Sequence, residues 1–280
     1  MSMPELPEVE TVVRGLRESL VGQKIVAVNV LWAGCVAELS AEAFVERVTG
    51  RAVTGVDRRG KWIVLHLDDG FSLFVHLRMT GQLLIEAGGC RPGDKYTRVL
   101  FYLGGGEQLR FSDMRKFGRL NLTDAPAEVL GELGPEPLDQ DFTVDRLRAM
   151  LAETRRRIKP LLLDQRFLAG LGNIYVNEAL WRAQVHPLRP ANSLSMGEVA
   201  ALHNAIQAVL REAIEEGGTT LDNGNFRQAD GEAGDFASRL LVYGRQGDPC
   251  ACCGAAIERI TVGQRGTFVC PVCQLPPRDA

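Results

Sequence analysis

The sequence predicts an α+β chain of several domains: a leading helix with an antiparallel β-sandwich or barrel, then a helical domain, then a small cysteine-rich module. Three observations predict it. Hydrophobic residues recur with a helical period at 8–20 and 199–214, short apolar runs fill 24–122, and paired cysteines follow residue 249. A chain of 280 residues fits about two domains and buries about 75% of its unfolded surface, so its core needs no disulfides.

The predicted first helix covers Glu8 to Leu20, and Gly22 is a plausible stop for it. Its apolar residues fall on one stripe: Val9, Val12, Val13, Leu16 and Leu20. Short strand-like runs follow, separated by Asp-Asp-Gly and Gly-Gly-Gly turns. They are 24–32, 51–57, 61–67, 71–77, 81–86, 97–103, 107–112 and 118–122. Short strands at this spacing favour an antiparallel sandwich or barrel.

Residues 124–145 are acidic and contain three prolines, which is typical of a linker. Helical patterns follow. Ser195 and Glu198 form a capping box, and a buried stripe then continues from Val199 to Ile214. A glycine-rich polar segment, 217–237, separates this helix from the cysteines. We see no internal repeat.

The net charge of −3 argues against a protein that simply coats nucleic acid. The charges are unevenly distributed, however. Six basic residues face one acidic residue in 146–159, and four face one in both 51–61 and 110–119. These patches fit a directional binding face, although solvated helix and strand faces would explain them equally well. No apolar run approaches the roughly 20 residues of a membrane span, and the N-terminus lacks a signal-peptide pattern, so we expect a cytoplasmic protein.

Four of the seven cysteines predict one structural zinc site. Cys250-x2-Cys253 and Cys270-x2-Cys273 are separated by sixteen residues, and four thiolates complete a tetrahedron with no position open for water. Disulfides are the alternative, disfavoured because nothing indicates an oxidising compartment.

The remaining cysteines have less informative positions. Cys252 could compete with Cys253 for the metal, although the spacing favours Cys253. Cys35 and Cys90 are interpreted as ordinary thiols. Arg265, on the expected hairpin tip of the zinc ribbon, could bind a phosphate or simply be solvated.

Several motifs together resemble the formamidopyrimidine-DNA glycosylase family nearly end to end. They are Met3-Pro-Glu-Leu-Pro-Glu-Val-Glu-Thr11, Arg59-Gly-Lys61, His76-Leu-Arg-Met-Thr-Gly81, Asp113-Met-Arg-Lys-Phe-Gly118, Leu133-Gly-Pro-Glu-Pro-Leu138, Ile158-Lys-Pro160, Gly170-Leu-Gly-Asn-Ile-Tyr175, Gly217-Gly-Thr-Thr220, Val242-Tyr-Gly-Arg245 and Phe268-Val-Cys-Pro-Val-Cys-Gln274. The resemblance implies a monomer that holds double-stranded DNA with oxidised bases or abasic sites. It also implies a β-sandwich catalytic domain (1–123), an acidic linker (124–142), a helix–two-turn–helix domain with a lesion-capping loop (143–240) and a zinc finger (241–280).

The resemblance assigns the nucleophile to Pro4. An α-amine titrates near 8 and a lysine near 10.4, so far more of the α-amine is unprotonated at neutral pH. Attack of a secondary amine on the sugar C1′ leaves an iminium, which acidifies C2′ and permits β- and then δ-elimination. The chain begins Met-Ser-Met-Pro, however, and an internal proline has no free amine. We therefore expect Met3 to be the working start.

The other catalytic roles also follow from the resemblance. Glu5 would protonate the sugar or the departing base, as suits a carboxyl group enclosed in a dry cleft. Lys61 would contact the phosphate beside the lesion and assist β-elimination. Arg265 would hold a phosphate and stabilise the leaving group during δ-elimination, since an arginine is a poor proton donor.

Six further residues match DNA-binding positions of the family. Met79, Arg115 and Phe117 match the trio that fills the gap left by an extruded base, although Met79 and Phe117 taken singly would more often be core residues. Tyr96 stands where the family often has a histidine, which removes any titrating role. Lys159 and Asn173 match phosphate-binding positions, and a helix beginning after Gly172 would present N–H groups to a phosphate.

Three functions remain open from the sequence. The first is a bifunctional glycosylase and abasic-site lyase of base excision repair, acting on 8-oxoguanine and formamidopyrimidines. The second is an enzyme of endonuclease VIII type that prefers oxidised pyrimidines. The third is a catalytically silent reader of DNA damage, expected if Pro4 is not N-terminal. The opening motif and the full-length capping loop, which the resemblance assigns to 217–237, favour the first over the second.

Overall fold

The computed structural model describes residues 3–86, 94–221 and 224–277, so Cys90 lies outside the described part. The chain divides into two compact units. The sandwich unit contains the residues up to Glu132 together with Ile214–Ala237, and the helical unit contains Leu133–Ala213 together with Ser238–Ala280. Among the described residues, no helix combines the length and the apolar character needed to cross a membrane.

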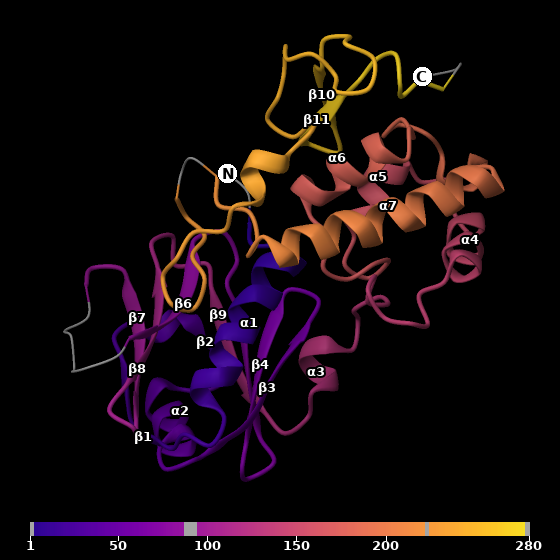
Figure 1. The fold of residues 1–280 in the computed structure, drawn as a ribbon. Coiled ribbons are helices and arrows are strands. Elements are labelled where there is room, and N and C mark those ends of the chain that lie inside the picture. The colour runs from indigo at the N-terminus through magenta and orange to yellow at the C-terminus, as the bar shows by residue number, and fades with distance from the viewer. Residues whose placement is uncertain (1–2, 87–93, 222–223, 278–280) are drawn as a thin grey trace. The chain divides into compact units, whose positions relative to one another are not determined.

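The sandwich unit is built from two mainly antiparallel sheets (Figure 1). The first has the order β1 (Ile25–Val30), β7 (Thr97–Leu103), β8 (Gln108–Asp113) and β6 (Gly81–Glu86). The second has the order β2 (Val36–Ala37), β9 (Arg119–Thr123), β5 (Ser72–His76), β4 (Trp62–Leu67) and β3 (Val53–Arg59). All eight predicted strands are confirmed. The separate sheets decide for a sandwich and against a closed barrel.

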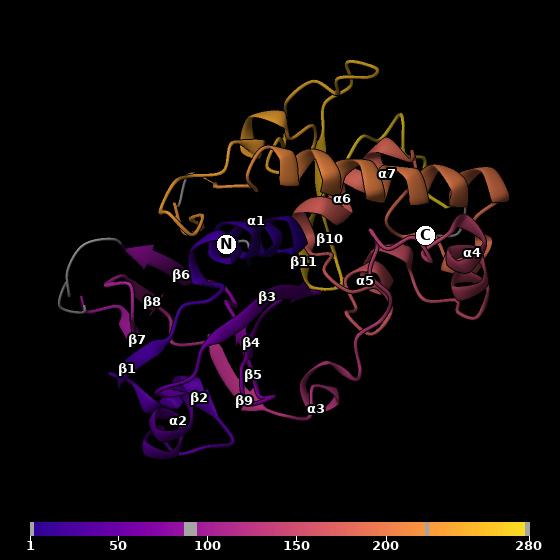
Figure 2. The same ribbon diagram turned by 60° about the horizontal axis from the view of Figure 1, so that its bottom comes forward.

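Helix α1 (Leu6–Leu20) contacts β3 and β6, which are edge strands of the two different sheets (Figure 2). Its predicted apolar stripe is fully buried in the core. Helix α2 (Ala41–Val48) was not predicted, because its eight residues carry little periodic signal. Ser40 caps it by accepting a hydrogen bond from the Ala43 N–H at 3.2 Å, and Phe44 packs edge-on against Phe101.

The glycine-rich segment 217–237 is part of the sandwich unit. Phe226 and Ala229 are buried in the sandwich core. The Ile85 N–H donates to the Ala229 carbonyl at 2.8 Å, and the Gln82 side chain donates to the Asn225 carbonyl at 2.8 Å. Residues 225–229 of this segment are therefore hydrogen-bonded to β6.

The helical unit contains α4 (Val144–Ala152), α5 (Ile158–Leu162), α6 (Asn173–Arg182) and most of α7 (Met196–Glu215). The predicted capping box of α7 is confirmed, since Ser195 and Glu198 each accept the other's backbone N–H. The stretch 124–145 is not a plain linker: it holds α3 (Ala127–Leu130) and the start of α4. A helix of four residues such as α3 leaves too little hydrophobic pattern for a sequence-based prediction.

A buried carboxylate ties α6 to the chain that leads into the cysteine-rich module. Glu178 accepts the N–H groups of Leu241, Val242 and Tyr243 at 2.8–3.0 Å. The module itself is the hairpin of β10 (Glu258–Val262) and β11 (Arg265–Val269) with two cysteine turns.

The four predicted ligands come together in this module, with all Sγ atoms within 4.8 Å of one another. Distances of 3.4 Å (Cys253–Cys270) and 3.9 Å (Cys250–Cys273) are far longer than a disulfide bond. They match the roughly 3.8 Å between thiolates on a tetrahedral zinc ion. Trp181 Nε1 donates to Cys250 Sγ at 3.4 Å, so α6 supports one ligand. The donor set fits one structural zinc.

The exposed Cys252 provides a matched test of this ligand set, because it adjoins Cys253 but lies outside the cluster. We expect Cys253→Ser to lose stoichiometric zinc and Cys252→Ser to retain one zinc per chain. Zinc released by a thiol reagent and measured with a chromogenic chelator gives the readout. Retention of zinc by Cys253→Ser together with loss from Cys252→Ser would reassign the ligand.

His76 on β5 is buried and held neutral. Its Nδ1 accepts the Arg78 N–H at 3.0 Å, and its ring packs edge-on against Trp62 at 4.8 Å. Burial, with the nearby charges of Arg78 and Lys61, lowers the pKa of His76 to about 3. The unfolded chain therefore binds a proton near pH 6.5 that the folded chain does not.

This difference predicts that folding stability falls as the pH drops below about 6.5, by up to ~1.4 kcal/mol per pH unit from His76 alone. We expect His76→Gln to show a shallower decline between pH 6.5 and 5, a window above the titration of most carboxylates. Leu31→Gln, a change at an exposed position that adds no titratable group, is the control and should keep the wild-type slope. Denaturant unfolding at each pH gives the free energy of unfolding. Equal slopes of this free energy against pH for His76→Gln and wild type would contradict the prediction.

Candidate functional site

The N-terminus of α1 places two of the predicted catalytic residues. Pro4 and Glu5 are both buried, and Glu5 stands at the N-cap in extended conformation. Pro7 occupies the first turn of α1, where a missing N–H costs nothing. The Glu5 N–H donates to Glu8 Oε2 at 2.8 Å, which fixes the backbone next to Pro4.

Glu8 also holds the start of the glycine-rich segment, because its Oε1 accepts the Thr219 N–H at 2.7 Å. Gly218 makes this approach possible. Its φ is +83°, and a Cβ there would lie 2.9 Å from the Phe226 ring and 3.3 Å from the Glu8 backbone. The contact joins residues 211 positions apart, so no local pattern in the sequence indicates it.

Lys61 lies on a tight β3–β4 turn. Arg59 pairs with Trp62, and Gly60 has a φ of +57°, a conformation that suits glycine. The Lys61 side chain is only 4% exposed. The ammonium is therefore held in a largely enclosed position.

Of the three predicted intercalating residues, Arg115 contacts both of the others. Arg115 Nη1 donates to the Met79 sulfur at 3.2 Å, and the Arg115 guanidinium lies 4.7 Å from the centre of the Phe117 ring. Phe117 is 45% exposed. We call Met79, Arg115 and Phe117 the wedge. It comes from two turns, β5–β6 and β8–β9, and is not part of the sandwich core.

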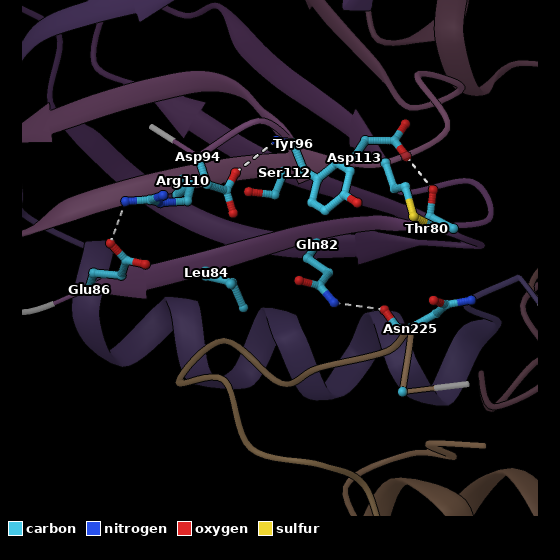
Figure 3. A pocket seen from close by; sticks show the side chains of 12 residues that line it. Thr80, Gln82, Leu84, Glu86, Asp94, Tyr96, Arg110, Ser112, Asp113 and Asn225 are labelled. Carbon is cyan, nitrogen blue, oxygen red and sulfur yellow. Dashed lines mark hydrogen bonds and ion pairs between the residues drawn. The ribbon is translucent and has the colours of Figure 1, made fainter. Parts of the chain in front are cut away.

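Tyr96 lines a polar cavity of about 250 Å³ on the outer side of β6 and β8 (Figure 3). Thr80, Asp113 and Asn225 line the same cavity. The Lys95 ammonium lies 4.9 Å from the centre of the Tyr96 ring, which adds a positive charge beside the phenol. Arg110, which belongs to one basic cluster of the sequence, is buried against Glu86 at 2.8 Å and is not on the surface.

In the helical unit, Arg265 directly follows the hairpin turn and is exposed. The turn residues Gly263 and Gln264 have φ of +55° and +60°, as a two-residue type I′ hairpin requires. The backbone behind Arg265 is held from α5 and α6. Asn173 donates to the Gly266 carbonyl at 3.1 Å, and Asn177 accepts the Phe268 N–H at 2.8 Å.

Lys159 takes part in the same support. Its side chain is fully buried, and its ammonium donates to Thr267 Oγ1 at 2.7 Å and to the Gly266 carbonyl at 3.1 Å. This geometry favours a positioning role over the direct phosphate contact expected from the sequence. The half-buried Asn173 stands at the start of α6, after Gly172 as predicted.

Three family models match successive parts of the chain. The formamidopyrimidine-DNA glycosylase N-terminal domain matches residues 3–120, and the H2TH domain of the same family matches 133–224. The zinc finger found in FPG and IleRS matches 247–275. The predicted fold class is thereby confirmed, including the helix–two-turn–helix domain and the zinc finger.

Similar proteins agree with these models. Formamidopyrimidine-DNA glycosylase of Herpetosiphon aurantiacus is 50% identical over 275 residues, covering 97% of this chain and 100% of the relative. A Lactococcus lactis FPG mutant in complex with a Fapy-dG containing DNA has a TM-score of 0.90 at 39% identity, covering 98% of this chain and 100% of that one. Wild-type Lactococcus lactis FPG with an oxidised pyrimidine containing DNA has a TM-score of 0.89 at 39% identity, with the same coverage. The chain belongs to the formamidopyrimidine-DNA glycosylase family.

Proposed function

We propose that this protein is a bifunctional DNA glycosylase and abasic-site lyase that excises 8-oxoguanine and formamidopyrimidines from double-stranded DNA. Membership of the family supports base excision repair of oxidised bases. The observation that carries the finer proposal is the buried Pro4–Glu5 pair, held at the start of α1 by Glu8 and Thr219. We expect the protein to act as a monomer in the cytoplasm, at the nucleoid.

In the proposed reaction, the amine of Pro4 attacks C1′ of the damaged nucleotide and the base leaves with a proton from Glu5. The proline nitrogen then loses its proton while the C1′–O4′ bond opens and O4′ takes up a proton, which leaves an iminium at C1′. The iminium withdraws electrons, so loss of a C2′ proton expels the 3′ phosphate, and a second elimination with loss of a C4′ proton expels the 5′ phosphate. An enclosed carboxyl group suits proton donation, since water does not compete for it.

Phosphate binding is assigned to the cationic groups of both units. Lys61 would neutralise the phosphate beside the lesion, and Arg265 would hold a second phosphate during δ-elimination. Asn173 would donate to the same phosphate region, while Lys159 would position the hairpin that carries Arg265. The bound zinc supplies no chemistry in this proposal and keeps that hairpin folded.

The wedge would fill the duplex after the damaged nucleotide is extruded. Unstacking a base costs a few kcal/mol, and an inserted aromatic or thioether side chain recovers part of the lost stacking. Arg115 would bond the base left without a partner. Tyr96 would donate its hydroxyl to a phosphate.

Oxidised pyrimidines remain a second candidate substrate class, because a relative has been crystallised with DNA containing one. Competition between an 8-oxoguanine duplex and an oxidised-pyrimidine duplex distinguishes the two. We expect faster excision of 8-oxoguanine.

The nucleophile can be tested by borohydride trapping on an 8-oxoguanine duplex, followed by peptide mass spectrometry. We expect a covalent adduct on the imino nitrogen of Pro4 in protein that starts at Pro4. A matched protein with one extra residue retained before Pro4 should bind the duplex and give no adduct. An adduct of equal yield with the blocked amine would refute Pro4 as nucleophile.

Glu5→Gln should separate base excision from cleavage at a preformed abasic site. Removing the proton donor is expected to slow base excision about 10²- to 10⁴-fold. Cleavage of a preformed abasic site should persist, because no base has to leave. Glu18→Gln, an exposed change on the same helix, is the control and should excise at the wild-type rate. Equal loss of both activities in Glu5→Gln, with an unchanged melting temperature, would contradict this role.

A further inference from the structure

The two turns that carry the wedge are joined by one buried carboxylate. Asp113 ends β8 and is 1% exposed. Its Oδ1 accepts the Thr80 hydroxyl at 2.5 Å and the Arg115 N–H at 3.1 Å, and its Oδ2 accepts the Gly118 N–H at 2.7 Å. Thr80 Oγ1 also accepts the Arg115 N–H at 3.1 Å. Figure 3 shows the Thr80 and Asp113 side chains meeting at one end of the cavity.

We infer that Asp113 and Thr80 form a clamp that positions the wedge for insertion into DNA. The inference rests on the proposed function, since it deepens the role of Met79, Arg115 and Phe117. Thr80 adjoins Met79 in the β5–β6 turn. The Asp113 side chain accepts hydrogen bonds from Arg115 and Gly118, so it bridges the β8–β9 turn that contains Phe117. Their hydrogen bond therefore connects the two turns at the base of the wedge.

Both turns adopt backbone conformations that need support. Arg78 has a φ of +55° and Lys116 a φ of +61°, the left-handed region that residues with side chains rarely occupy. Each of these residues immediately precedes a wedge residue. Such conformations persist where the surroundings hold them in place. The two Asp113 oxygens supply this hold on the β8–β9 turn, from Arg115 to Gly118.

The close packing around Gly118 leaves the β8–β9 turn few alternative backbone conformations. A Cβ on Gly118 would lie 2.4 Å from the Phe111 ring and 3.2 Å from Asp113 Oδ2. On the other turn, the Gly81 N–H donates to the Leu77 carbonyl at 2.9 Å, and a Cβ on Gly81 would lie 2.3 Å from that carbonyl oxygen. The clamp thus holds two turns that are each already compact.

The strand that bears Asp113 does not need this carboxylate. The Asp113 N–H donates to the Tyr96 carbonyl at 2.9 Å, and Arg98 Nε donates to the Asp113 carbonyl at 2.8 Å. These backbone contacts keep β8 in the sheet regardless of the side chain. The side chain acts on the turns, so its loss should affect wedge placement more than the fold.

Thr80→Val tests the clamp, because it removes the hydroxyl and preserves the shape of the side chain. We expect single-turnover excision from an 8-oxoguanine duplex to fall about 10- to 100-fold, as for a small misplacement of a positioning group. Cleavage of a preformed abasic site should fall less, because no base has to be unstacked. Thr80→Ser should restore excision, since it returns the hydroxyl.

A double mutant distinguishes a positioning role of Thr80 from a general loss of structure. In a Phe117→Ala background, Thr80→Val should cause little additional loss, because the wedge is already defective. Thr123→Val, at the far end of β9 where the hydroxyl donates to Glu128, is the matched control. It should retain both the wild-type rate and the wild-type melting temperature. Asp113→Asn should reproduce the Thr80→Val pattern, since an amide cannot accept on both sides.

The clamp is overturned if Thr80→Val excises at the wild-type rate, loses both activities equally, or adds its full effect to Phe117→Ala. A wild-type protein without any excision would instead refute the proposed function. In that case, 2-aminopurine opposite the lesion still reports wedge insertion on binding. A signal of equal size in wild type and Thr80→Val would overturn the clamp independently.

Discussion

The carboxylate of Glu8 is the contact on which the proposed active site depends. One oxygen accepts the N–H of Glu5 and the other accepts the N–H of Thr219, so a single buried group fixes the start of α1 and the entry of the glycine-rich segment. A buried carboxylate is costly unless it is hydrogen-bonded, and backbone N–H groups satisfy it on both sides. The backbone beside Pro4, at Glu5 and at Thr219, is therefore held in a fixed position by Glu8.

Buried polar groups have the same function elsewhere in each unit. Asp113 joins the two turns of the wedge, Lys159 supports the hairpin that carries Arg265, and Glu178 holds the chain that leads into the zinc module. In each case an ionisable side chain inside the protein bonds to backbone or hydroxyl groups of a turn or loop. These bonds are directional, so they position a loop more sharply than apolar contact alone.

Much of the fold could be predicted because it depends on local pattern. The period of hydrophobic residues indicates α1 and α7, and alternating runs between turn residues indicate eight strands. The capping box at Ser195 is equally local. Helices α2 and α3 escaped prediction, because eight residues or fewer hold little periodic signal. Their positions are decided by packing, as the contact of Phe44 with Phe101 shows.

The sequence by itself determined the zinc ligands, the order of the domains and the residues that resemble a family's catalytic set, because spacing and residue type along the chain carry that information. Only the tertiary structure decided what surrounds those residues. It buried Lys159 behind the hairpin, brought Thr219 to Glu8, and joined Thr80 to Asp113. Such partners lie tens to hundreds of positions apart, and no spacing rule connects them. Folding alone brings them within hydrogen-bonding distance.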